Sequence, residues 1–77
     1  MPSYTVTIVN EHFSQDGEHE AVDNNAAWKG AISSAIAIAA EQVSQGNPFF
    51  GAEVTIAQGS EQIGRYLVSV GSTPLKD

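Results

Sequence analysis

Ionisable side chains concentrate in one short part of the chain, which contains Glu11-His12 and Asp16-Gly17-Glu18-His19-Glu20. Imidazole nitrogens and carboxylate oxygens both ligate divalent metals, so His12 and His19 are the candidate metal ligands. Their spacing matches neither the EF-hand loop nor the helical H-E-x-x-H of zinc hydrolases. Consecutive residues of an extended chain also point in opposite directions and do not converge on one ion. We therefore predict a solvated acidic loop without a metal site.

The chain has no recognisable catalytic residue set. A general acid/base pair of carboxylates needs a cleft that shifts one pKa, whereas these acids are expected in a polar, hydrated loop. The sequence has no G-x-S-x-G elbow, no G-x-x-x-x-G-K-[ST] phosphate loop and no cysteine. We therefore predict a protein that is not an enzyme, with no catalytic residue and no cofactor.

Aromatic residues are the remaining candidates for binding. Trp28 could stack on a flat ligand, although a place in the core is the simpler expectation. Phe49 and Phe50 could form an exposed apolar patch. Because neighbouring residues of an extended chain cannot both face inward, we expect one of these two phenylalanines to close the core.

Alternating apolar residues predict three strands. Their core-facing residues are expected to be Tyr4, Val6 and Ile8 in the first strand, Ala52, Val54 and Ile56 in the second, and Val68 and Val70 in the last. Residues 58–62 are predicted to form a hairpin turn. Residues 10–22 are predicted to form a loop that turns at Asp16-Gly17, and a short edge strand over residues 18–22 is the alternative.

One helix is predicted between Asp23, a typical N-cap residue, and Gly46, which with Pro48 is typical of a helix end. Its core-facing stripe is expected to contain Trp28, Ile32, Ala35, Ile36, Ala39 and Val43. The opposite face contains the small residues Gly30, Ser33 and Ala37. We expect this face to be a weakly charged solvent surface, and packing of a second helix there is the alternative.

These elements predict a two-layer α+β fold. One amphipathic helix packs on a small, mainly antiparallel sheet of three strands, or of four if the acidic segment adds one, in the order β-(β)-α-β-β. The 77 residues form a single domain over residues 1–77, and residues 71–77 are expected to be a flexible tail. A domain of this size is expected to be marginally stable.

The charge balance restricts the partners. Nine acidic residues outnumber three basic ones, which gives a formal net charge of −6. This field disfavours binding to nucleic acid and to anionic membranes. Because the sequence has no secretory signal and no apolar run long enough to span a membrane, we predict a cytoplasmic location.

A set of short motifs runs through nearly the whole chain. Its members are Met1-Pro2-Ser3-Tyr4, Asp16-Gly17, Asp23, Ala27, Ala31, Ala35, Gly46, Glu53-Val54 and Gly64-Arg65. In this order they resemble a family of short proteobacterial proteins known as domain of unknown function 6894. The chain departs from that family in its helix, which carries only Lys29 and Glu41 as charged residues, and in Thr5 of the first strand. The resemblance implies an α+β fold and no assigned activity, so no functional residue is carried over.

Two functional hypotheses follow. The first is a small non-enzymatic interaction module, whose partner is an unidentified protein or a second copy of the chain, bound through the small-residue helix face, an exposed sheet edge or the Phe49-Phe50 region. Its candidate contact residues are Phe49, Phe50, Gly30, Ser33 and Ala37. The second rests on the strand, helix, strand, strand order, which is similar to that of dodecins, small flavin-storing homo-oligomers. That similarity implies a flavin carrier with Trp28 as the stacking residue, although a shared fold does not establish function.

Overall fold

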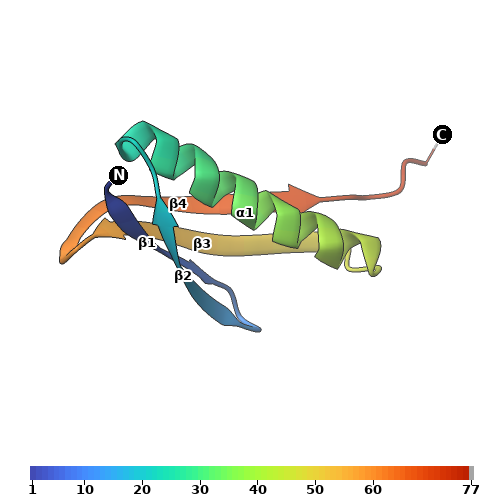
Figure 1. The fold of residues 1–77 in the computed structure, drawn as a ribbon. Helices are drawn as coiled ribbons and strands as arrows, with labels where there is room; N and C mark the ends of the chain where they lie inside the picture. The colour runs from blue at the N-terminus through green and yellow to red at the C-terminus, as the bar shows by residue number, and fades with distance from the viewer. Residues whose placement is uncertain (77) are drawn as a thin grey trace.

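The computed structural model describes residues 1–76 and consists of one helix on one face of a four-stranded sheet (Figure 1). The elements are β1 (Ser3–Val9), β2 (Ser14–Glu20), α1 (Asn24–Ser44), β3 (Phe49–Gln58) and β4 (Glu61–Gly71). The sheet has the order β2-β1-β3-β4, and all neighbouring strands are antiparallel. The predicted two-layer α+β fold is confirmed, and the acidic segment provides the fourth strand.

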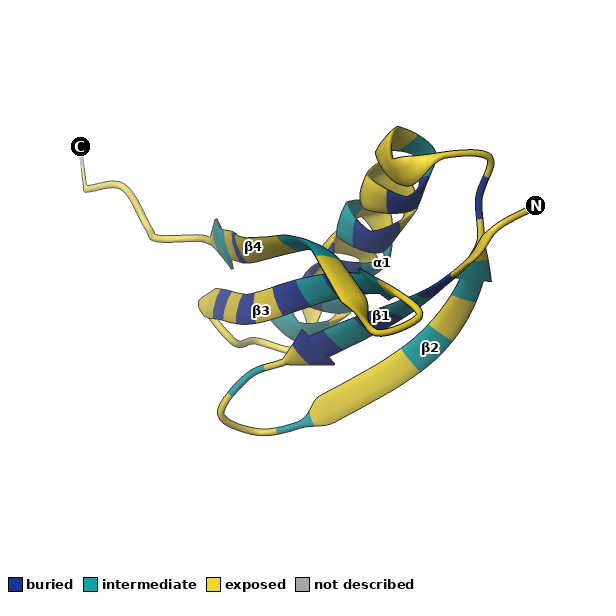
Figure 2. Cartoon of the chain, turned by 90° about the vertical axis from the view of Figure 1, so that its left-hand side faces the viewer, coloured by how far each residue is buried: buried dark blue, intermediate teal, exposed yellow. Residues whose placement is uncertain are grey.

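The core lies between α1 and the face of the sheet that the helix covers. The buried strand residues are Tyr4, Val6 and Ile8 of β1, Phe50, Ala52, Val54 and Ile56 of β3, and Val68 of β4. In Figure 2 buried and exposed residues alternate along β3, as period-2 geometry requires. The predicted inward faces of these strands are therefore confirmed, and Arg65 is exposed as expected.

The helix packs on the sheet through a ridge of alanines. Ala27, Ala31, Ala35 and Ala39 follow one another at four-residue spacing, and none is more than 3% exposed. Such a row lies along one side of a helix, and its small side chains let the backbone approach the sheet closely. The predicted stripe is only partly correct, because Ile36 is 49% exposed and Trp28 is 37% exposed. Because the helix lies close to the sheet, only small residues fit between them, and the bulky residues lie on the flanks of the helix.

The C-terminal end of α1 is a Schellman motif. Gly46 has a φ of 101°, a conformation that favours glycine. Its N–H donates to the Val43 carbonyl at 3.0 Å, and the Asn47 N–H donates to the Gln42 carbonyl at 3.3 Å. The predicted helix end at Gly46 is confirmed.

The N-terminal end of α1 is capped by Asp23, whose Oδ1 accepts a hydrogen bond from the Ala26 N–H at 2.8 Å. We expect Asp23→Ala to lower the free energy of unfolding by about 1 kcal/mol, because it removes the acceptor for one of the unpaired N–H groups of the first turn. Asp23→Asn keeps an acceptor and should change stability little. Urea denaturation of the three proteins measures this difference, and equal stability of Asp23→Ala and the parent protein would contradict it.

The first hairpin turns at Asn10–Phe13, so the prediction of a turn at Asp16-Gly17 is wrong. The Asn10 side-chain oxygen accepts hydrogen bonds from the N–H groups of His12 (2.8 Å) and Phe13 (3.1 Å). The Asn10 N–H donates to the Phe13 carbonyl at 3.0 Å. Asparagine closes such turns with its own side chain, which leaves Asp16 and Gly17 inside β2.

The second hairpin turns at Gly59-Ser60, within the predicted segment, and Gly59 has a φ of 60°. A register shift beyond Ile56 leaves Ile63 without an opposite residue, so β4 is regular from Gly64 onward. Gly71 ends β4, residues 72–76 lie outside helices and strands, and Asp77 lies outside the described residues. Across residues 1–76, α1 is the only helix, and it is not long and apolar enough to cross a membrane.

Candidate functional site

The N-terminal part of β3 extends past the end of β1. The last pair between these strands is Val9 with Glu53, so residues 49–52 pair with β4 alone. One edge of β3 is therefore free over residues 49–52, although β3 is an interior strand of the sheet.

The backbone of Phe49 and Gly51 faces this free edge. In an antiparallel sheet, the N–H and C=O of one residue point to the same side and alternate residues point to opposite sides. The Pro48 carbonyl accepts a hydrogen bond from the Ser72 N–H at 2.7 Å, so the backbone groups of Pro48 point toward β4. By alternation, those of Phe50 and Ala52 also point toward β4, and those of Phe49 and Gly51 point the other way. Among residues 1–76, no backbone hydrogen bond to Phe49 or Gly51 is formed from the β1 side.

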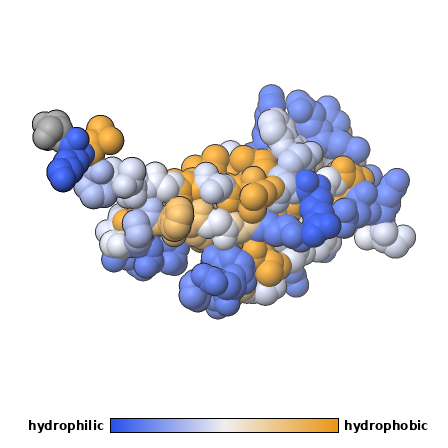
Figure 3. Space-filling view, turned by 180° about the vertical axis from the view of Figure 1, so that it is seen from behind, coloured by the Kyte–Doolittle hydropathy of each residue, from blue (hydrophilic) through white to orange (hydrophobic). Residues whose placement is uncertain are grey.

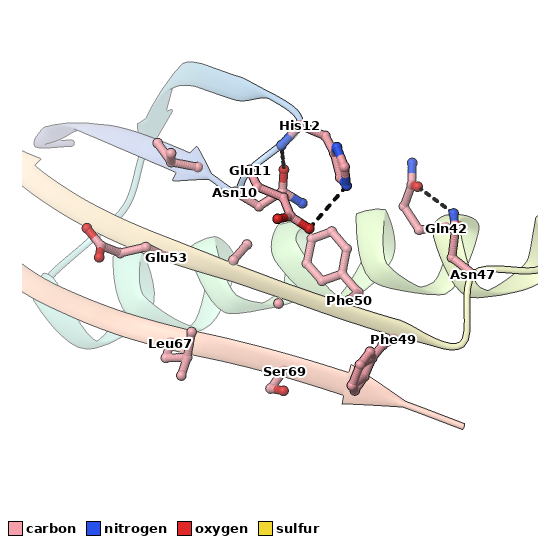
Figure 4. Close-up of a pocket in the computed structure, with 13 residues that line it drawn as sticks. Asn10, Glu11, His12, Gln42, Asn47, Phe49, Phe50, Glu53, Leu67 and Ser69 are labelled. Atoms are coloured by element: carbon pink, nitrogen blue, oxygen red, sulfur yellow. Dashed lines mark hydrogen bonds and ion pairs between the residues drawn. The ribbon is translucent and has the colours of Figure 1, made fainter. Parts of the chain in front are cut away.

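A groove of about 490 Å³ surrounds this edge (Figure 4). We call it the β3 groove. Its walls are Asn10, Glu11 and His12 of the first hairpin turn, Gln42 and Asn47 at the end of α1, Phe49 and Gly51 of β3, and Leu67 and Ser69 of β4. In Figure 4 the turn lies on one side of β3, and the side chains of Leu67 and Ser69 lie on the other.

Two large apolar side chains stand exposed at the β3 groove. Phe49 is 71% exposed and Leu67 is 78% exposed. Both project from the sheet face that α1 does not cover, because they alternate with the buried Phe50 and Val68. A partner segment that covered them would remove apolar surface from water, which favours binding.

The polar groups of the groove are linked by hydrogen bonds and ion pairs. The Asn47 side-chain N–H donates to the side-chain oxygen of Gln42, Oε1, at 3.1 Å, and His12 Nε2 lies 3.3 Å from a Glu11 carboxylate oxygen. Glu53 Oε2 accepts a hydrogen bond from Arg65 at 2.9 Å, which holds the pKa of Glu53 below its ordinary value. The groove thus carries two carboxylates, Glu11 and Glu53, of which Glu53 is paired with Arg65.

The structure does not bring the two histidines together. His12 lies in the first hairpin turn, whereas His19 pairs with Tyr4 at the other end of β2. The strand residues 14–19 alone extend over roughly 17 Å. Within residues 1–76, no group of three or more histidine, aspartate and glutamate side chains is placed to hold a metal ion.

Trp28 lies at the flank of α1, where its ring centroid is 6.1 Å from that of Tyr66 at an interplanar angle of 53°. The cleft beside it measures about 220 Å³, below the roughly 300–1,000 Å³ of typical small-molecule sites. Because one side of the indole already contacts Tyr66, nothing in the cleft favours a flavin over other ligands. Flavin binding at Trp28 stays a prediction.

The other predicted contact residues differ in exposure. Phe50 is only 5% exposed and packs on Phe13 with ring centroids 6.4 Å apart, so the structure corrects its assignment to a contact surface. Phe49 is the exposed member of the pair, as alternation along a strand requires. Gly30, Ser33 and Ala37 are exposed on the helix face away from the sheet, where the sequence places them.

Sequence reasoning missed Leu67 and Gly51 as site residues. The assignment of Val68 and Val70 to the inward face already implied that Leu67 faces outward, so a signal for its exposure was present. No signal marked Gly51, because its free backbone depends on where β1 ends beside it.

Comparison of the chain with protein-family models, with curated proteins and with solved structures finds no match. The resemblances to domain of unknown function 6894 and to dodecins therefore stay predictions.

Proposed function

We propose that this protein is a non-enzymatic interaction module that binds an extended segment of a partner protein as an added strand at the free edge of β3. One observation carries the proposal. The unpaired backbone of Phe49 and Gly51 lies in a groove beside the exposed side chains of Phe49 and Leu67.

Strand addition accounts for each feature of the β3 groove. Main-chain hydrogen bonds to Phe49 and Gly51 supply affinity, and contacts of alternate side chains supply specificity. The added segment takes the place that a longer β1 would occupy. Every second side chain of the segment then lies on the uncovered sheet face, next to Phe49 and Gly51, while the others face the turn and the end of α1.

Charge defines the preferred segment more closely. The groove carries the carboxylates of Glu11 and of Glu53, which is paired with Arg65, and the whole chain carries a formal net charge of −6. Opposite charge on the partner speeds encounter and excludes acidic competitors. The expected ligand is a short extended peptide in which apolar residues alternate with polar ones and which carries a lysine or arginine.

Substitution of Gly51 tests this mode of binding. The backbone of Gly51 does not have a positive φ, and a Cβ built there meets nothing within 4 Å, so Gly51→Ala should fold and bind normally. Gly51→Pro removes the N–H that faces the groove, while the hydrogen bonds of Phe50 and Ala52 to β4 remain. We expect the peptide dissociation constant to rise about tenfold or more. One main-chain hydrogen bond is lost, and the proline ring displaces the added strand.

The measurement starts with selection of random displayed peptides on the parent protein. Fluorescence anisotropy with one labelled selected peptide then compares the parent, Gly51→Ala and Gly51→Pro. Peptides with alternating apolar residues that bind the first two proteins alike and the third weakly support the proposal. Failure to enrich any peptide, or equal binding to Gly51→Pro with its fold intact by circular dichroism, contradicts it.

A further inference from the structure

The outer edge of β4 is a second unpaired backbone edge, on the opposite side of the sheet from β2. The Pro48–Ser72 hydrogen bond also shows which backbone groups of β4 point toward β3 and which point outward. Gly64, Tyr66, Val68 and Val70 lie opposite the β4-facing residues of β3 and bond inward. The backbone groups of Arg65, Leu67, Ser69 and Gly71 therefore point outward, away from the sheet.

Apolar side chains flank this edge on both faces. Tyr66 and Trp28 are each 37% exposed and Ile36 is 49% exposed on the helix side, while Leu67 is 78% exposed on the other side. Trp28 and Ile36 lie two four-residue steps apart on one flank of α1, and the contact of Trp28 with Tyr66 places that flank above β4. In Figure 1 β2 crosses in front and β4 lies behind, so the view from behind in Figure 3 looks onto this side. Hydrophobic atoms gather in its middle.

The opposite edge of the sheet lacks these features. β2 carries Asp16, Glu18 and Glu20, all of them exposed, and charged edge strands resist pairing with other strands. The regular part of β4 carries Arg65 as its only charged residue. A chain of net charge −6 repels its own copies, and two copies joined at the regular part of β4 would not bring acidic residues of that strand together.

We propose that two copies of this chain associate through their β4 strands, which pair antiparallel about a two-fold axis beside Val68. Val68 itself bonds inward, but it lies midway along residues 65–71, whose odd-numbered members have outward-pointing backbone groups. In this register Arg65 pairs with Gly71 of the second copy and Leu67 pairs with Ser69 of the second copy. Each of these pairs exchanges both main-chain hydrogen bonds.

The same register matches the side chains. On the helix side Tyr66 lies opposite Val70 of the second copy, and the two Val68 residues face each other across the axis. A two-fold axis perpendicular to the sheet places both helices on one face of a continuous sheet, with their Ile36 flanks toward each other. The β3 groove shares Leu67 and Ser69 with this interface, but its free backbone belongs to Phe49 and Gly51 on the other side of β3. Gly51→Pro therefore tests the groove, and the mass in solution tests the dimer.

The mass in solution tests the interface. Light scattering on the eluting protein should give twice the 8.1 kDa chain mass. Ser69→Pro removes an outward N–H from an exposed edge position, where proline is tolerated, and should raise the dimer dissociation constant at least about tenfold. Ser69→Ala keeps the N–H and should leave the dimer intact. If Ser69→Pro does not fold, Leu67→Asp supplies the same test, because Leu67 is exposed in the monomer and opposes the second copy in the dimer.

A parent protein that stays monomeric up to millimolar concentration overturns the proposal. So does a dimer that persists in folded Ser69→Pro or Leu67→Asp.

Disulfide trapping tests the register, because the native chain has no cysteine. In the proposed dimer the two Val68 residues form a non-hydrogen-bonded pair with Cα atoms about 4.5 Å apart, which suits a disulfide. Val68→Cys should form a covalent dimer under mild oxidation, and Ser60→Cys in the exposed second hairpin turn should not. Equal cross-linking of both variants, or none in Val68→Cys, rules out the axis at Val68.

Discussion

Phe50→Ala is expected to lower the free energy of unfolding by about 3–5 kcal/mol, the usual cost of removing a buried phenylalanine ring. Phe50 is 5% exposed and packs on Phe13 where the first hairpin turn meets β3. A domain of this size has a total stability of roughly 4–12 kcal/mol. The substitution therefore removes a large part of the stability, and a substantial unfolded population is expected at 25 °C.

The neighbouring residue is the matched control. Phe49→Ala deletes the same ring from a side chain that is 71% exposed, so its effect on stability should stay within about 0.5 kcal/mol. Urea denaturation followed by circular dichroism at one fixed protein concentration compares the two variants, since self-association would otherwise shift the midpoint. A cost for Phe49→Ala as large as that for Phe50→Ala would reverse the assignment of the pair.

Ala35→Leu is the second change with a large expected effect. Ala35 is 0% exposed at the centre of the alanine ridge, where α1 lies against the sheet. A leucine there must push the helix outward or adopt a strained rotamer, which typically costs about 1–3 kcal/mol and sometimes more. The higher end is expected, because neighbouring Ala31 and Ala39 are also fully buried and leave no space into which the side chain can turn.

Ala37→Leu provides the comparison for this change, because Ala37 lies on the exposed face of the same helix. Leucine and alanine differ little in helix propensity, so the variant should remain as stable as the parent. Thermal unfolding should show a clear drop in Tm for Ala35→Leu and almost none for Ala37→Leu. Equal shifts in the two variants would mean that the alanine ridge is not the packing face.

Much of the fold follows from local sequence patterns. Alternation identified the inward faces of β1, β3 and β4, and Asp23 and Gly46 marked the ends of α1. The packing face of the helix was less predictable, because the apolar flank that includes Ile36 is as hydrophobic as the alanine ridge. The distance between helix and sheet determines which of these two faces packs on the sheet, and this distance depends on the tertiary structure.

The candidate site was predictable in part. Adjacent phenylalanines indicated one exposed side chain, and the structure shows that it is Phe49. The β3 groove depends on the strand order and on the end of β1 at Val9, which a single sequence leaves open. The turn at Asn10 was missed because Asp16-Gly17 has the stronger turn composition, whereas pairing with β1 holds those two residues in a strand.

Amide hydrogen exchange at Gly51 tests the free edge of β3 most directly. The account predicts fast exchange at Gly51 in the free protein and slow exchange at Ala52, whose N–H bonds to β4. Saturation with a selected peptide should then slow exchange at Gly51 and leave Ala52 unchanged. Protection of Gly51 equal to that of Ala52 in the free protein, or unchanged exchange at Gly51 in the saturated complex, would contradict strand addition at this edge.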